Sequence, residues 1–199
     1  CGTQRTWWDD QRGGQDPTRV ELIVEGSLVA EGTEENRILF TSSQESPTRG
    51  DSYGIRVVLT SPDALVSLDH CEVEYGVVGV GVAASVSPSS VSIRNCVIHH
   101  TAGAGIALTS QSSGKVAVDF SHNTISNNSG AGMSCRVTGL GSEITGTIEG
   151  NDVSASGGNG VDIRTESGGK SVLAIRGNRV HENTPGHGLC LYISYTNTI

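Results

Sequence analysis

Aromatic and apolar side chains are scarce in this chain of 199 residues, at 4% and 35% of the composition. A composition this poor in apolar residues approaches that of disordered chains. Here, however, the apolar residues recur at regular intervals, which predicts a folded domain. Long apolar runs are absent as well. No stretch reaches the ~18 apolar residues of a membrane-spanning helix, so we expect no membrane span.

Lysine is almost absent, and cysteine lacks the spacing of a metal site. Two Lys accompany eleven Arg, and the formal charge is −8. An acidic chain of this kind lacks the clustered basic side chains that nucleic-acid phosphates require, which excludes a nucleic-acid partner. The five Cys show no C-x-x-C spacing, which argues against a zinc site, and their odd number argues against a full disulfide framework.

Helical periodicity is also missing, because no segment repeats its apolar residues every ~3.6 positions. Residues 1–18 are a polar, irregular leading segment. From residue 19 onwards, apolar and polar residues alternate in short segments separated by glycine and polar corners, as in residues 22–24, 28–30 and 38–40. This alternation predicts short β-strands. We therefore expect one all-β domain over residues 19–199.

The chain repeats one pattern five times: an apolar strand, a Cys or Asn, a β-branched residue, a polar turn, Gly-x-Gly and a second strand. The Cys/Asn positions, separated by 25, 27, 28 and 27 residues, are Cys71, Cys96, Asn123, Asn151 and Asn178. Apolar residues stand three positions before them: Leu68, Ile93, Phe120, Ile148 and Ile175. β-Branched residues stand two positions after them: Val73, Ile98, Ile125, Val153 and Val180.

A period this short, built only from strands, predicts a parallel β-helix. Each turn of chain places three strands on three faces, and successive turns stack about 4.8 Å apart. We expect roughly six or seven coils. Aligning the second glycine of each pair, at positions 81, 105, 132, 160 and 188, gives the inward rows Val82, Ile106, Met133, Val161, Leu189 and Ala84, Leu108, Cys135, Ile163, Leu191.

The Cys/Asn row is expected to form an internal ladder at one corner of the coil. Stacked Asn amides offer donors and acceptors to one another and to the bent backbone. Cys71 and Cys96 replace Asn as small buried thiols. Stacked Cα atoms lie within the ~4.4–6.8 Å that a disulfide tolerates, but parallel side chains make the bond awkward, so both states stay open. The Gly-x-Gly corner allows positive φ and a tight approach at the next bend.

Two stretches resemble a known superfamily. Residues 24–33, together with Ile38-Leu39-Phe40-Thr41-Ser42, resemble the start of many bacterial secreted or surface β-helix proteins. The Asn-x-Ile/Val and Gly-x-Gly repeats resemble the coil of the pectate-lyase-like superfamily of right-handed parallel β-helices. The resemblance covers roughly residues 20–193 and implies an extracellular or cell-envelope location. It does not specify an activity, because this fold carries lyases, glycosidases, epimerases, adhesins and plain stalks.

In the lyases of that superfamily, sugar binds along the sheet that follows the Gly-rich turn. The expected outward rows of this sheet are Ala83, Ala107, Ser134, Asp162, Cys190 and Ser85, Thr109, Arg136, Arg164, Tyr192. Arg136 and Arg164 should stack in neighbouring coils with Asp162 beside them. Asn159 and His187 lie on the adjoining turn, and Tyr192 and Glu166 flank the patch. These four are candidate substrate-binding residues.

An arginine stack attracts a carboxylate, and a uronate would bind guanidinium groups bidentately. Arg136, Asp162 and Arg164 are therefore candidate catalytic residues for elimination from an acidic sugar, where an Arg beside a carboxylate serves as the base. Three readings stay open: a polysaccharide-binding protein, a pectate-lyase-like enzyme, and a structural stalk or adhesin module. In the stalk reading these side chains form a solvated ion-pair network.

No cofactor is expected. Calcium-dependent lyases place several Asp or Glu on neighbouring coils of this sheet, and here only Asp162 is in register, with Glu166 uncertain. His99 and His100 share a turn, but His181 lies several coils away, so no metal site is expected either.

The chain start leaves two readings open. Cys1 is either the lipidated end of a bacterial lipoprotein or the boundary of a fragment from a longer solenoid, and we favour the fragment. We expect a monomer.

Overall fold

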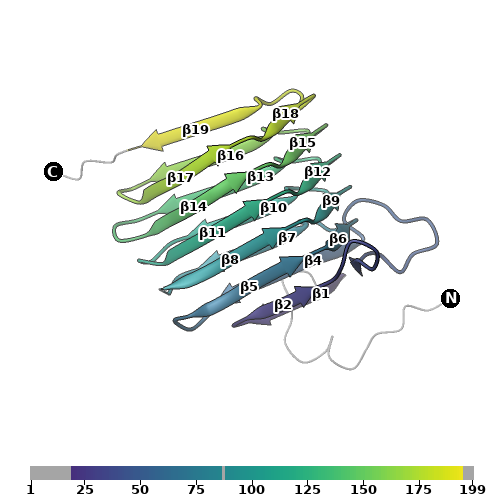
Figure 1. Cartoon of the computed structure of the whole chain (residues 1–199), viewed down its shortest axis with the longest axis horizontal. Coiled ribbons are helices and arrows are strands. Elements are labelled where there is room, and N and C mark those ends of the chain that lie inside the picture. The colour runs from purple at the N-terminus through teal and green to yellow at the C-terminus, as the bar shows by residue number, and fades with distance from the viewer. Residues whose placement is uncertain (1–18, 87, 195–199) are drawn as a thin grey trace.

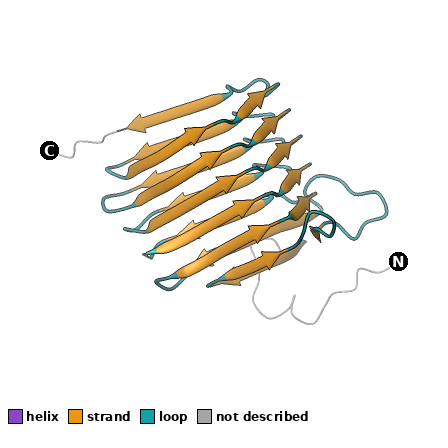
Figure 2. Cartoon of the chain, in the orientation of Figure 1, coloured by secondary structure: helices purple, strands orange, loops and turns teal. Residues whose placement is uncertain are grey.

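The computed structural model describes residues 19–86 and 88–194, and within them the chain forms nineteen strands in three parallel sheets (Figures 1 and 2). These residues contain no helix that could cross a membrane. Cys1 and the rest of the leading segment 1–18 lie outside the described residues. The expectations for the leading segment therefore stay predictions.

Three sheets wrap around one core. Sheet A contains β1 (Val20–Glu25), β4 (Ser52–Leu59), β7 (Val80–Ala84), β10 (Ile106–Ser110), β13 (Met133–Thr138), β16 (Val161–Glu166) and β19 (Leu189–Ser194). Sheet B contains β2 (Leu28–Glu31), β5 (Ala64–Asp69), β8 (Ser89–Arg94), β11 (Lys115–Ser121), β14 (Glu143–Glu149) and β17 (Lys170–Arg176). Sheet C contains β3 (Ile38–Phe40), β6 (Cys71–Glu74), β9 (Val97–His99), β12 (Thr124–Ser126), β15 (Asp152–Ser154) and β18 (Arg179–His181).

Each coil visits sheets A, B and C in turn before the chain steps to the next coil. The described residues make six such coils and the first strand of a seventh, which confirms the predicted three-strand coil. In Figure 1 the coils follow one another along the molecule from β1 to β19. Because every strand pairs only with its equivalents in the neighbouring coils, sequence positions about one repeat apart lie side by side.

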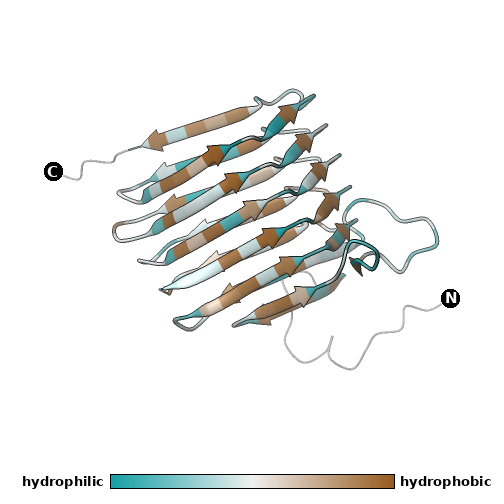
Figure 3. Ribbon diagram, in the orientation of Figure 1, coloured by the Kyte–Doolittle hydropathy of each residue, from teal (hydrophilic) through white to brown (hydrophobic). Residues whose placement is uncertain are grey.

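The core is a stack of aliphatic columns, one from each inward row. Figure 3 shows the alternation of apolar and polar residues along the strands. The two predicted columns that flank the corner are confirmed by the pairing of Leu68 with Ile93 and of Val73 with Ile98. Phe120 is the largest fully buried side chain, and the other buried side chains of the core are mainly aliphatic.

An amide ladder runs through the corner between sheets B and C, as the sequence predicts. The Asn123 backbone N–H and Nδ2 both donate to Oδ1 of Asn151, each at 2.9 Å. Asn151 repeats both bonds onto Asn178, at 2.9 and 2.8 Å. Each of the three Nδ2 groups also donates to a carbonyl of the coil before, for example Asn123 to Ile93 at 2.8 Å. The buried backbone at this bend is therefore satisfied from coil to coil.

Two thiols occupy the first ladder positions in place of amides. Cys71 and Cys96 are both buried and free, so the structure has the reduced state. The Cys96 Sγ donates to the carbonyl of Arg94 at 3.0 Å and accepts the Cys71 N–H at 3.5 Å. The hydrogen bond with Cys71, together with burial, raises the pKa of Cys96 well above its usual range, which keeps this thiol protonated and unreactive.

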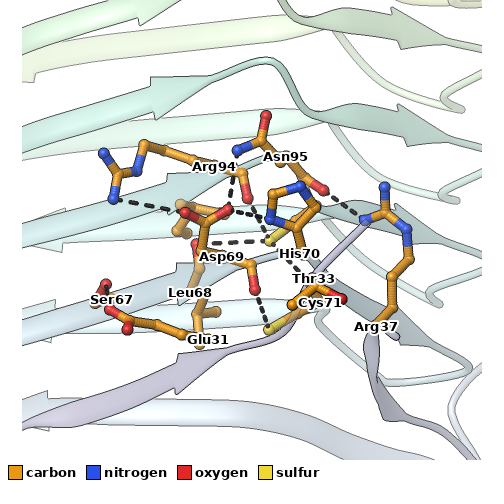
Figure 4. Close-up of polar contacts among 12 residues, drawn as sticks. Glu31, Thr33, Arg37, Ser67, Leu68, Asp69, His70, Cys71, Arg94 and Asn95 are labelled. Atoms are coloured by element: carbon orange, nitrogen blue, oxygen red, sulfur yellow. Dashed lines mark hydrogen bonds and ion pairs between the residues drawn. The ribbon is translucent and has the colours of Figure 1, made fainter. Parts of the chain in front are cut away.

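Beside Cys71 and Cys96, a network of charged and polar side chains joins the first three coils (Figure 4). The Asp69 carboxylate faces His70 Nδ1 at 2.7 Å and accepts a hydrogen bond from Asn95 Nδ2 at 2.9 Å. It also pairs with Arg94 at 3.6 Å, and Arg37 donates to the Asn95 carbonyl at 2.5 Å. These contacts support the corner where the thiols bridge the coils through longer bonds than the amides, such as the Cys71 N–H to Cys96 Sγ bond at 3.5 Å.

A second polar ladder, which the sequence reasoning missed, follows five residues after the first. Its buried members stand at the bend after sheet C: Thr101, Asn128, Ser156 and Asn183. The Thr101 N–H donates to Oδ1 of Asn128 at 3.1 Å, and the Ser156 N–H donates to Oδ1 of Asn183 at 3.0 Å. The sequence signal was the spacing of 27, 28 and 27 residues. It was hidden because Thr and Ser alternate with Asn.

The predicted register of β7 was wrong by two residues. Val80, not Val82, pairs with Ile106, and Val82 pairs with Leu108. The matching glycine is accordingly Gly79 rather than Gly81, because the coil that holds Cys71 has one residue fewer before this turn.

The glycines of this row allow close packing and do not need positive φ. A Cβ at Gly105 would lie 2.7 Å from Cγ2 of Ile125. Positive φ is found instead at the first turn residue after sheet C: Tyr75, His100, Asn127, Ala155 and Glu182. The predicted tight approach is therefore present at these glycines, whereas the left-handed backbone lies elsewhere in the turn.

The ladder leads to a first prediction. Asn123→Ala leaves the buried Cys96 N–H and Ile93 carbonyl without their side-chain partners, and each loss costs about 1–3 kcal/mol. We expect the free energy of unfolding to fall by about 3 kcal/mol in urea titrations. The adjacent exposed Thr124→Ala serves as control and should stay within about 0.5 kcal/mol of the parent. Equal losses in the two variants would contradict a stabilising role for the amide.

Candidate functional site

The outward face of sheet A carries the predicted site residues in two rows. The pairing places Asp162 between Ser134 and Cys190, and Arg164 between Arg136 and Tyr192, as predicted. The earlier coils differ because of the two-residue shift in β7. Gly81, not Ala83, continues the first row, and Ala83, not Ser85, continues the second. Ser85 lies beyond the end of β7.

Arg136 and Glu166 form an ion pair across neighbouring strands. Nε and Nη2 of Arg136 both donate to Oε2 of Glu166, at 3.0 and 2.6 Å. Glu166 pairs in register with Thr138, two residues beyond Arg136, so its side chain reaches back diagonally. The Arg136 side chain is 54% exposed, which leaves its outer surface open to solvent.

Asp162 and Arg164 form a second ion pair within β16. Nε of Arg164 donates to the two carboxylate oxygens of Asp162, at 3.3 and 3.0 Å. The Asp162 side chain is only 10% exposed, whereas that of Arg164 is 48% exposed. Nη1 and Nη2 of Arg164 have no partner among the described residues. Tyr192, which is half exposed, stands next to Arg164 on β19.

The two predicted turn residues also lie together. The His187 backbone N–H donates to Oδ1 of Asn159 at 2.9 Å, so the Asn159 side chain joins one turn to the next. The His187 side chain remains exposed. The structure thus brings the candidates together as two ion pairs with an adjacent tyrosine, and as one pair on the turn.

The outward face of sheet A carries small side chains in the preceding coils. The outward residues of β7 and β10 and the first of β13 are Gly81, Ala83, Ala107, Thr109 and Ser134. Arg56 of β4 stands at one end of this floor, and Arg136 and Arg164 stand at the other. The result is a flat strip bounded by guanidinium groups.

A second polar region lies over the turns that follow sheet C. The long loop between β3 and β4, residues 41–51, reaches across these turns, and Nη1 of Arg49 donates to Oγ of Ser129 at 3.3 Å (Figure 2). Beside it is a groove of about 370 Å³, lined by Arg49, Asn128, Ser129, Ala155, Ser156, Gly157, Glu182 and Thr184.

The loop holds its shape through Asp51. Oδ1 of Asp51 accepts the Thr48 hydroxyl at 2.6 Å, and Oδ2 accepts the Thr48 N–H at 2.8 Å and the Ser42 hydroxyl at 3.0 Å. These bonds, led by the one from the Thr48 hydroxyl, lower the pKa of Asp51 below its ordinary value of 3.8.

A cluster on the outward face of sheet C was not expected from the sequence. It contains Glu72 and Glu74 of β6, His99 of β9 and the following His100. Nε2 of His99 lies 3.2 Å from Oε1 of Glu72, and Nδ1 lies 3.7 Å from Oε2 of Glu74. Nδ1 of His99 also lies 2.6 Å from Nδ1 of His100.

The surroundings of His100 favour its neutral form. Its ring stacks on Tyr75 with centroids 5.7 Å apart. Burial lowers the pKa of His100, and the neighbouring His99 and Arg49 lower it further against the opposing pull of Glu74. His181, on the same sheet, takes part in a separate contact with Asp152 at 3.0 Å and does not join this cluster.

The Asp51 contacts predict a pH-dependent loop. Because the folded-state pKa of Asp51 is depressed, its stabilising contribution is present above pH 3.8 and is lost as the pH falls through the lower folded value. We expect Asp51→Asn to raise the backbone mobility of residues 44–50 at neutral pH, measured by NMR relaxation. The parent should show the same mobility only at more acidic pH. Glu45→Gln, an exposed change in the same loop, should alter neither. A loop equally rigid in Asp51→Asn would contradict this role.

Comparison with known families supports the fold. A family model described as "Right handed beta helix region" matches residues 49–147. Searches of curated proteins and of solved structures gave no match. The matched segment covers β4 to β13 completely, and the described coils on either side continue the same three sheets. The chain therefore folds as a right-handed parallel β-helix. This fold is consistent with the pectate-lyase-like superfamily.

Proposed function

We propose that this chain is a secreted or cell-envelope protein that binds acidic polysaccharide along the outward face of sheet A. The β-helix fold itself supports a structural or polysaccharide-related role in general terms. The observation that carries the narrower proposal is the flat strip of small side chains that ends at Arg136 and Arg164.

The strip suits an extended sugar chain because its outward side chains are small on three successive strands, β7, β10 and the start of β13. Its residues repeat about every 4.8 Å, the distance between neighbouring strands, so successive sugars would meet equivalent surfaces. The side chains of Gly81, Ala83 and Ala107 are too small to block a ring that lies on the backbone. Thr109 and Ser134 add hydroxyl groups that can bond to sugar hydroxyls.

The arginines supply the preference for an acidic sugar. Arg164 uses Nε for Asp162, which fixes the guanidinium plane and leaves both Nη groups for a ligand. A uronate carboxylate fits such a group, since two parallel N–H donors match its two oxygens. The ion pair with nearly buried Asp162 thus orients Arg164 without covering it.

Tyr192 and the turn residues extend the surface on either side of Arg164. A half-exposed aromatic ring can cover the apolar face of a sugar while its hydroxyl remains in water. His187 stands on the adjoining turn, held by the bond from its N–H to Asn159. We assign Tyr192 and His187 to binding and Asn159 to positioning His187.

A structural stalk is the second candidate function. The pairing of Arg136 and Arg164 with carboxylates of this chain favours it. Arg136 pairs with Glu166 on the neighbouring strand and Arg164 pairs with Asp162 on its own strand, as in a surface network that needs no ligand. The elimination hypothesis requires a base at this face. Arg164 and Asp162 are engaged with each other, so the geometry supports binding better than turnover.

Affinity electrophoresis in gels containing alginate or pectate tests the proposal. We expect the parent protein to be retarded by these polyuronates and not by a neutral glucan. Arg164→Ala removes charge-assisted hydrogen bonds worth about 1.5–3 kcal/mol. The apparent Kd should therefore rise roughly tenfold or more.

Arg176→Ala is the matched control, because Arg176 is likewise an exposed arginine paired with a carboxylate, that of Glu149 on sheet B. It should leave the retardation unchanged. Absence of retardation in the parent would favour the stalk. Ultraviolet absorbance that grows with time on the same polyuronates would instead reveal a lyase.

A further inference from the structure

The cluster on sheet C has the composition and spacing of a metal site, on a different face from the proposed glycan strip. We propose that Glu72, Glu74 and His99 bind one divalent transition-metal ion of the Zn²⁺ type. One ligand atom from each of the three residues lies within 4.8 Å of the other two. This departs from the sequence-based expectation of no metal site, which compared His99 only with the other histidines.

The backbone places the three ligands on one face. Glu72 and Glu74 are two residues apart on β6 and therefore project to the same side of the sheet. His99 pairs in register with Glu74 on the neighbouring strand β9. Glu72 faces Nε2 of the imidazole and Glu74 faces Nδ1. Side-chain rotation is therefore required to gather one ring nitrogen and both carboxylates at the ~2.0–2.2 Å at which zinc binds His nitrogen and carboxylate oxygen.

The ligand set indicates which class of ion fits. One imidazole and two carboxylates suit Zn²⁺ and similar ions, whereas Ca²⁺ and Mg²⁺ prefer sites made only of oxygen. Two carboxylates balance the charge of a divalent cation. Without a cation, the two negative carboxylates lie near one another in a chain whose formal charge is already −8.

The surroundings already hold the ligands in place. The Thr41 hydroxyl donates to Oε1 of Glu74 at 2.7 Å, which orients this carboxylate and leaves Oε2 toward His99. Hydrogen bonds that orient a metal-binding carboxylate in this way are typical of metal sites. The His99 and Glu74 side chains are each only 16% exposed, so the site is partly shielded from water, while the Glu72 side chain, 34% exposed, leaves it reachable.

His100 is placed to complete the set. Its Nδ1 lies 2.6 Å from Nδ1 of His99, so an ion bound at that nitrogen would have His100 beside it. The stack on Tyr75 limits the positions that the His100 ring can adopt. Three protein ligands with a fourth position open to His100 or to water match the tetrahedral geometry that zinc prefers.

Equilibrium dialysis of the full chain against Zn²⁺ alone, with bound metal measured by mass spectrometry, tests the site. We expect one ion per chain for the parent. The near-isosteric Glu74→Gln and the His99→Asn variant should each weaken binding by more than roughly tenfold. Thr41→Ala should weaken it by about tenfold, because it removes the hydrogen bond that orients Glu74. Thermal unfolding should show that the variants still fold. Added Zn²⁺ should raise the Tm of the parent but not that of His99→Asn.

His181→Asn is the matched control, because His181 of sheet C also faces two carboxylates, those of Asp152 and Glu182, but in a more exposed setting. It should leave the stoichiometry and affinity unchanged. Visible absorption of bound Co²⁺ gives the ligand type, and an intense thiolate band would assign the ion to a cysteine and overturn the proposal. The proposal is likewise overturned if the parent binds no ion, or if His181→Asn loses it as His99→Asn does. Polyuronate retardation should be unchanged in Glu74→Gln, so the two proposals fail separately.

Discussion

The fold depends on the hydrogen bonds that link asparagines of successive coils at the corner between sheets B and C. The chain turns sharply there with its polar backbone buried, and water cannot reach it. Asn123, Asn151 and Asn178 satisfy that backbone, and each also sets the height of the next coil. Once this height is set, the Ile and Val columns, the glycine row and the two outward faces fall into register.

Much of the fold could be predicted because stacking turns sequence period into spatial proximity. The Leu68 and Val73 columns and the pairing of Arg136 with Arg164 follow from equal spacing alone. The prediction failed at Gly79, where one coil is a residue shorter and glycine occurs at two alternate positions, so the pattern fits in two ways. It missed the second ladder because the small polar residues that form it are of different types, namely Thr, Ser and Asn.

The candidate site was less predictable, because side-chain direction is not encoded by period. Neighbouring arginines could be read from the repeat, but their pairing with Glu166 and Asp162 depends on rotamers. The sheet C cluster joins unlike residues, Glu74 and His99, across 25 positions, and a search for repeated residue types cannot find it. Sites of this kind become visible only when the register is known.

The amide ladder has a direction along the stack. Each Oδ1 accepts from the coil before it, and each backbone N–H donates to the coil after it. The two ends of any such stack therefore differ chemically, because one end presents acceptors and the other presents donors. Since each strand pairs only with strands of the neighbouring coils, damage to the pairing of one coil remains local. Such a molecule can change its length by whole turns without redesign of the rest.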